Sequence, residues 1–177
     1  MKTFSLKFLD IMIGVVLGLG FQWWPALTQS WQIVAFVFVY LDIIDYWIDY
    51  GPSLKKFPPK REIDVFLDVG IMFCLFLYIY STQLTLVYLF SAFILLRLLD
   101  FFWLLSSKSE YNPVGVDGKF VNTWLRFNLI EGLVSVGFVV LAYLSAFSSL
   151  LLLIGFIGFR IIMRFLASLK YKKVHFV

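Results

Sequence analysis

The sequence predicts an all-α integral membrane protein whose six transmembrane helices form three tandem helical hairpins, with both termini in the cytoplasm. Of its 177 residues, 62% are hydrophobic and only 15% are charged, whereas soluble domains carry about 25% charged residues. The third observation is a pattern of charged residues that recurs in each hairpin, which predicts an internal repeat.

Six apolar segments are long enough to cross about 30 Å of hydrocarbon at about 1.5 Å per residue. Short turns without charge alternate with longer basic connections between them. The predicted segments are residues 6–26, 31–50, 63–80, 84–106, 121–146 and 149–169. Paired in order, they give hairpins at about 6–50, 63–106 and 121–169, within a single transmembrane domain that covers residues 1–177.

The basic residues lie on one side of this topology. They occupy both chain ends and the connections 51–62 and 106–120: Lys2, Lys7, Lys55, Lys56, Lys60, Arg61, Lys108, Lys119, Lys170, Lys172 and Lys173. Because Lys and Arg are enriched in cytoplasmic connections, these parts are predicted to face the cytoplasm. The predicted location is the cell membrane, with the lipid bilayer as the chain's main partner.

The repeat appears in both helices of each hairpin. The first helices contain FLDIMIG (8–14), FLDVGIM (66–72) and, more loosely, LIEGLVS (129–135). The second helices contain LDIIDYW, LRLLDFFW and FRIIMRFL. The acid of the first helix precedes the first charge of the second by 32 residues (Asp10 to Asp42), 29 (Asp68 to Arg97) and 29 (Glu131 to Arg160). This spacing predicts a pseudo-threefold parallel repeat about an axis near the membrane normal.

The charges are also confined in depth. No Asp, Glu, Lys or Arg occurs in residues 11–41, 69–96 or 132–159, which form the outer part of each hairpin. The intramembrane layer next to the cytoplasm holds six acids (Asp10, Asp42, Asp45, Asp68, Asp100 and Glu131) and three arginines (Arg97, Arg160 and Arg164). Carboxylates in excess of their partners inside a membrane take up a proton or a cation.

This excess predicts a multi-pass transport protein, a channel or a transporter, that handles a proton, a cation or a small solute through a cytoplasm-facing acidic cavity. The predicted binding residues are Asp10, Asp42, Asp45, Asp68 and Glu131. Arg97, Asp100, Arg160 and Arg164 are the predicted internal counter-charges. If a metal ion binds, Asp42, Asp45 and Asp68 are its expected ligands, since an all-oxygen set suits hard divalent or monovalent cations. No cofactor and no catalytic residue is assigned.

A structural role for the same layer stays open. Arg97 and Asp100, three residues apart, form a natural helical ion pair, and buried ion pairs can fix helices against one another. On this alternative the chain is a non-catalytic membrane assembly or lipid-binding protein. Gly14 and Gly18 show the spacing of close helix packing, which we assign to contacts within the monomer, while a homo-oligomer remains open.

The rare residue types exclude several classes of function. Cys74 is the only cysteine and His175 the only histidine, which excludes an internal disulfide, a thiolate metal cluster and a bis-histidine haem. No Ser/His/Asp or Cys/His nucleophile can be assembled. The basic residues lie beside membrane segments, so nucleic acid is not an expected partner.

Four acids also match the spacing of a known enzyme motif. Asp42, Asp45, Asp64 and Asp68 fit the acids of D-x2-D-G-x2-A-R, followed by eight or nine residues and G-x3-D-x3-D. On this spacing the chain resembles the CDP-alcohol phosphotransferases, six-helix enzymes that act on lipid headgroups. The resemblance implies a metal-dependent lipid-headgroup enzyme, with these acids as a metal site for a cytidine diphosphate lipid.

The motif is eroded between the acids. Tyr46 stands at its first glycine, Asp49 and Tyr50 at the Ala-Arg pair, and Lys60 at its second glycine. In the family the small residues let the nucleotide approach and the arginine meets phosphate. Fold-level likeness alone does not assign a function, so the enzyme stands as an alternative to transport.

Overall fold

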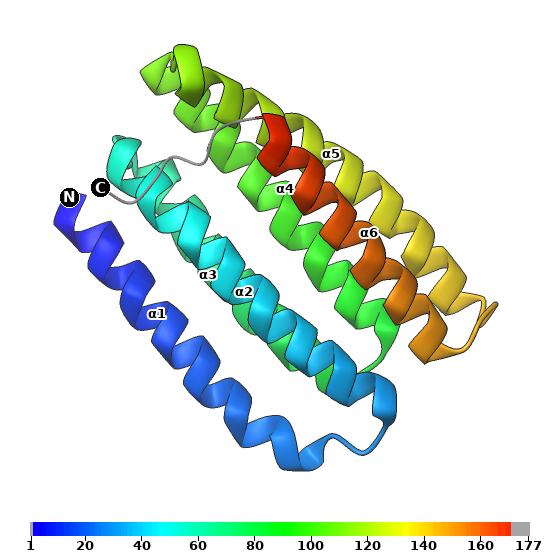
Figure 1. The fold of residues 1–177 in the computed structure, drawn as a ribbon. Coiled ribbons are helices and arrows are strands. Elements are labelled where there is room, and N and C mark those ends of the chain that lie inside the picture. Colours follow the sequence, from blue (N-terminus) through cyan, green and yellow to red (C-terminus); the bar gives the residue numbers. More distant parts are fainter. Residues whose placement is uncertain (1, 171–177) are drawn as a thin grey trace.

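The computed structural model describes residues 2–170, and this part of the chain consists of helices without strands (Figure 1). Two short 3-10 helices, η1 (Trp24–Ala26) and η2 (Ser81–Gln83), lie in the turns after α1 and α3. The α-helices are α1 (Lys2–Trp23), α2 (Ser30–Lys56), α3 (Glu62–Tyr80), α4 (Leu86–Tyr111), α5 (Gly115–Tyr143) and α6 (Ser149–Lys170).

All six of these helices are long and apolar enough to cross a membrane, as expected for a multi-pass membrane protein. They run up and down the bundle in alternation (Figure 1). The start of α1, the end of α6 and the connections 57–61 and 112–114 lie at one end of the bundle, called here the charged end. Lys172 and Lys173 of the predicted basic tail lie outside the described residues.

At the charged end, helices extend beyond the predicted membrane segments, most clearly α2, α4 and α5. The helix α2 passes through Pro52, which lacks an N–H group, and the Ser53 hydroxyl donates to the carbonyl of Asp49 at 2.7 Å. The helix α4 extends to Tyr111, so the predicted connection 106–120 shrinks to residues 112–114. Asn112 then ends α4 in the left-handed conformation, with a φ of 43°. Polar residues at these ends are therefore helical, not looped.

The packing gives no support to the predicted threefold rotation. Such a rotation would make the three contacts between successive hairpins equivalent. Instead, the first and second hairpins meet mainly through α1 and α3, the second and third through α4 and α5, and the third and first through α6 and α2. These pairs join first to first, second to first and second to second helices. The three-hairpin repeat thus stays a prediction from sequence.

The end of the bundle opposite the charged end is packed with aromatic rings. Phe156 of α6 lies at its centre, with ring centroids 4.8 Å from Phe90, 5.0 Å from Phe93 and 5.5 Å from Phe138. Phe90, Phe93 and Phe156 are fully buried. This phenylalanine cluster joins α4, α5 and α6 where the sequence has no charge.

The glycines that contact other helices are not those of the predicted packing motif. A Cβ atom added at Gly14 or Gly18 would meet nothing within 4 Å, so these two glycines do not mediate packing within the monomer. At Gly20, by contrast, an added Cβ would lie 2.3 Å from the Ile79 Cδ1 atom and 3.2 Å from Tyr40. Gly20 therefore lets α1 approach α2 and α3.

Candidate functional site

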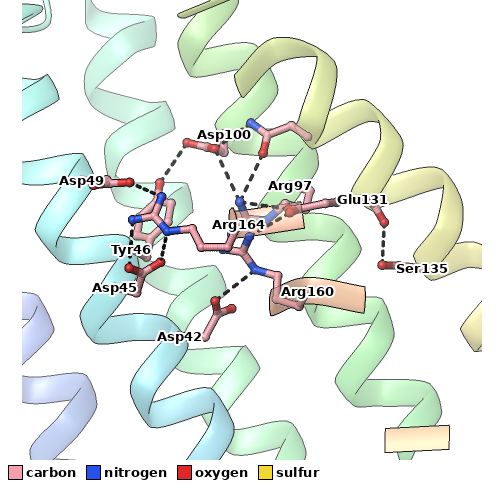
Figure 2. A network of polar contacts seen from close by, with 11 residues as sticks. Asp42, Asp45, Tyr46, Asp49, Arg97, Asp100, Glu131, Ser135, Arg160 and Arg164 are labelled. Atoms are coloured by element: carbon pink, nitrogen blue, oxygen red, sulfur yellow. Dashed lines mark hydrogen bonds and ion pairs between the residues drawn. The ribbon is translucent and has the colours of Figure 1, made fainter. Parts of the chain in front are cut away.

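Two arginines and three carboxylates form a continuous chain of ion pairs across α2, α4, α5 and α6 (Figure 2). Arg160 pairs with Asp42 at 3.1 Å and with Glu131 at 2.8 Å. Arg97 pairs with the other Glu131 oxygen at 3.6 Å and with Asp100 at 3.9 Å. We call this sequence, Asp42–Arg160–Glu131–Arg97–Asp100, the first charge chain.

All five side chains of the first charge chain are buried, and Glu131 has no exposed surface. An isolated buried charge costs several kcal/mol, so pairing is what allows five of them to lie together. The helices supply these groups through simple spacing. Arg97 and Asp100 are one turn apart on α4, while Glu131 on α5 lies between the two arginines and bridges them.

Two neutral side chains complete the first charge chain around Asp100. Asn128 accepts a hydrogen bond from Arg97 at 3.2 Å and donates one to Asp100 at 2.7 Å. The Tyr46 hydroxyl donates to the other Asp100 oxygen at 3.1 Å. Neither residue was predicted from the sequence, although Asn128 precedes Glu131 by one turn and Tyr46 follows Asp42 by one turn, which places them on the charged faces.

A third arginine holds two further carboxylates. The Arg164 guanidinium forms two contacts with Asp45, from Nε at 2.8 Å and from Nη2 at 2.9 Å. Its third nitrogen pairs with Asp49. We call Asp45–Arg164–Asp49 the second charge chain. The predicted acidic layer omitted Asp49, although this residue shares a helix face with Asp42 and Asp45.

Asp68 and Asp10 lie apart from both chains and contact no arginine within the described residues. Asp68 is buried and accepts a hydrogen bond from Tyr50 at 2.6 Å, while its second oxygen has no hydrogen-bond partner in that part of the chain. Asp10 is exposed and accepts a hydrogen bond from the Trp47 indole at 3.1 Å. The acids predicted to share one layer therefore occupy different environments.

A small cavity adjoins both charge chains. Its volume is about 40 Å³, which gives room for roughly two or three water molecules. Asp45, Asp49, Asp100 and the three arginines supply its polar wall. Aromatic side chains supply much of the rest, namely Tyr46, Tyr50, Trp103, Phe120 and Trp124.

Arg97 brings unsatisfied donors to this cavity. The side chain is 2% exposed, and its Nε and Nη2 atoms make no hydrogen bond to any described residue. Buried donors without partners are costly and are normally satisfied by ordered water or by a ligand. The cavity that Arg97 lines has room for ordered water, which can accept hydrogen bonds from these donors.

Phe93 lies against the two arginines of the first charge chain. The Arg97 Cζ atom lies 4.9 Å from the centroid of the Phe93 ring, and the Arg160 Cζ atom lies 5.9 Å from it. Phe93 also belongs to the phenylalanine cluster through its contact with Phe156. The first charge chain therefore borders the phenylalanine cluster.

The acids of the phosphotransferase-like motif are not gathered into a metal site. Asp42 and Asp45 pair with different arginines, and Asp68 bonds Tyr50. Asp64 accepts hydrogen bonds from the Arg61 backbone at 3.0 Å and from a serine of α4 at 2.6 Å. Among residues 2–170, no three His, Cys, Asp or Glu side chains are grouped so that they could hold a metal ion.

Asp64 belongs instead to a separate polar cluster at the charged end. Arg61 pairs with Asp64 at 3.4 Å and with Glu110 at 2.5 Å, and it donates to Ser106 at 2.5 Å. The hydrogen bond to Asp64 raises the pKa of the Arg61 guanidinium above its usual value, so the side chain stays charged. This cluster ties the start of α3 to the end of α4.

Comparison with known proteins gives no match for the chain among protein-family models, curated proteins or solved structures. The resemblance to the CDP-alcohol phosphotransferases is therefore supported neither by a family match nor by the arrangement of the four acids.

Proposed function

We propose that the protein is a membrane transport protein that binds a proton or a small cation at the cavity beside the two charge chains. The observation that carries this proposal is the count of charges in each chain. Three carboxylates meet two guanidinium groups in the first chain, and two carboxylates meet one in the second. Each chain thus has a formal charge of −1.

A surplus negative charge is unfavourable at this depth. In hydrocarbon, an uncompensated charge costs about 2.5 kcal/mol or more, and carboxylates that crowd one another tend to keep a proton or bind a cation. The surplus of the second chain lies at the cavity, because both Asp45 and Asp49 line it. A proton, or a cation that has shed most of its water, fits a volume of about 40 Å³.

The proposed direction of access follows from the ends of the bundle. Ser53, Leu104 and Phe120 line the cavity on the side of the charged end. Basic residues gather at this end, namely Lys55, Lys56, Lys60, Arg61, Lys108 and Lys119. By the positive-inside rule, we assign this end and both termini to the cytoplasm. The site would then open to the cytoplasm, and the phenylalanine cluster would close it toward the other side until a conformational change opens it.

Flux through liposomes tests the proposal. Purified protein is reconstituted, and uptake is followed with dyes for H⁺, Na⁺, K⁺, Mg²⁺ and Ca²⁺ under imposed gradients. We expect flux of one of these ions above protein-free liposomes, and its loss in Asp45→Asn, which removes the surplus charge of the second chain.

Asp117→Asn is the matched control, because Asp117 is an acid near the charged end that pairs with Lys56 outside both charge chains. It should keep wild-type flux. If the wild type carries none of these ions, the charge chains are structural, as in the non-catalytic assembly alternative.

A further inference from the structure

The start of α5 and the end of α6 both lie at the charged end of the bundle (Figure 1). Residues from these two segments line a second cavity. Its volume is about 320 Å³, which is within the usual range of ligand pockets, from about 300 Å³ upward. The residues that line it are Lys119, Asn122, Thr123, Arg126, Phe127 and Lys170. None of them is acidic, so three positive charges face one concavity.

Helical spacing builds this cavity. Lys119, Asn122, Thr123 and Arg126 follow one another at intervals of three, one and three residues, which places them on one face of α5. Thr123 is buried at the base. Lys170 comes from the last turn of α6, and its ammonium group lies 4.9 Å from the centre of the Phe127 ring.

Arg126 differs from the other arginines of the chain. Arg61, Arg97, Arg160 and Arg164 each pair with at least one carboxylate. Arg126 is exposed and has no carboxylate partner within residues 2–170. Its planar fork of donors, which suits two oxygens of a phosphate, is therefore uncommitted.

We propose that this cavity binds the phosphate of an anionic phospholipid headgroup. Arg126 and Lys119 contact the phosphate oxygens, Asn122 and Thr123 supply neutral donors, and Lys170 closes the site from α6. The position suits a lipid, since both helices are membrane-spanning and basic pockets between such helices take anionic headgroups. This binding is independent of the proposed transport site, because no residue that lines the second cavity lines the first.

Native mass spectrometry of the full chain in detergent tests the proposal, with dioleoylphosphatidylglycerol and dioleoylphosphatidylcholine as probes. We expect the wild type to bind the phosphatidylglycerol more tightly. Each basic residue near a lipid surface contributes about 1 kcal/mol, or about fivefold in affinity. The double variant Lys119→Gln with Arg126→Gln should therefore bind phosphatidylglycerol about 25-fold more weakly and lose its preference for this lipid over phosphatidylcholine.

The matched control is Lys55→Gln with Lys108→Gln, which removes the same charge from exposed residues near the charged end. This variant should keep the phosphatidylglycerol affinity within about twofold. Equal losses in the two double variants, or equal affinity of the wild type for both lipids, would overturn the proposal.

Binding of inorganic phosphate is measured as a third probe. Binding of free phosphate that depends on Arg126, without a preference for phosphatidylglycerol, would assign the cavity to a soluble anion and overturn the lipid proposal. Both substituted residues are exposed, so equal thermal unfolding of the variants and the wild type verifies that the fold is intact.

Discussion

The two ends of the bundle are held together by different interactions. In the middle of the bundle and toward the charged end, ion pairs between three arginines and five carboxylates join four helices. Toward the opposite end, phenylalanine rings pack without a formal charge. Apolar burial does not by itself drive helices together in lipid, so ion pairs and close packing carry the association. Removing a charge and removing a ring should therefore destabilise the bundle for different reasons. The first strands a buried partner charge, and the second leaves a cavity.

The largest effect is expected at the centre of the first charge chain. Arg160→Gln strands Asp42 and Glu131, and breaking a buried pair costs about 3–5 kcal/mol. Denaturant titration in mixed micelles measures the free energy of unfolding. Arg126→Gln, at an exposed arginine without a carboxylate partner, is the control and should change it by about 0.5 kcal/mol or less. Equal losses in Arg160→Gln and Arg126→Gln would contradict the stabilising role assigned to the first charge chain.

A smaller loss is expected in the phenylalanine cluster. Phe156→Ala leaves a cavity of roughly 100 Å³, which costs about 2 kcal/mol at about 24 cal/mol per Å³. The transfer part of the usual cost is absent because lipid is itself apolar. Ile154→Ala on the exposed face of α6 is the control. The same titration should show no comparable loss for it, and a loss equal to that of Phe156→Ala would mean that the cluster is not specifically packed.

The smallest effect concerns the approach of α1. Gly20→Ala places a methyl group against the Cδ1 atom of Ile79. Because this atom is the far end of a flexible side chain that can turn away, the loss should be about 1 kcal/mol, at the low end for overpacking. Gly14→Ala meets nothing and should be neutral or slightly stabilising, because alanine favours helix over glycine. Thermal unfolding of the two variants compares them. Equal losses in Gly20→Ala and Gly14→Ala would contradict the close approach of α1 to α3 at Gly20.

Composition and segment length predicted the helices well, because crossing a bilayer imposes a minimum length and apolarity on each segment. Helix ends were less predictable. Pro52 and the polar residues before Asn112 are typical of loops, yet α2 and α4 continue through them. The prediction of six membrane-spanning helices needed only local sequence, whereas their order around the bundle depends on side-chain packing.

The charged residues of the site were visible in the sequence, but their partners were not. Arg97, Asp100, Glu131, Arg160 and Asp42 do meet. Which arginine holds which acid depends on the rotation of each helix, and this cannot be read from spacing alone. The spacing also suggested that Asp10 and Asp68 share the layer, although each faces an aromatic donor of α2 instead.

The most direct test of the surplus charge compares ion-dependent stability in the wild type and in Asp45→Asn. A cation or proton that binds only the folded protein raises its free energy of unfolding. We predict that one of H⁺, Na⁺, K⁺, Mg²⁺ or Ca²⁺ stabilises the wild type and not the variant. Without that ion, Asp45→Asn should unfold near wild type, because Asp49 still pairs with Arg164. A wild type insensitive to all five ions, together with an Asp45→Asn loss as large as that of Arg160→Gln, would contradict the account.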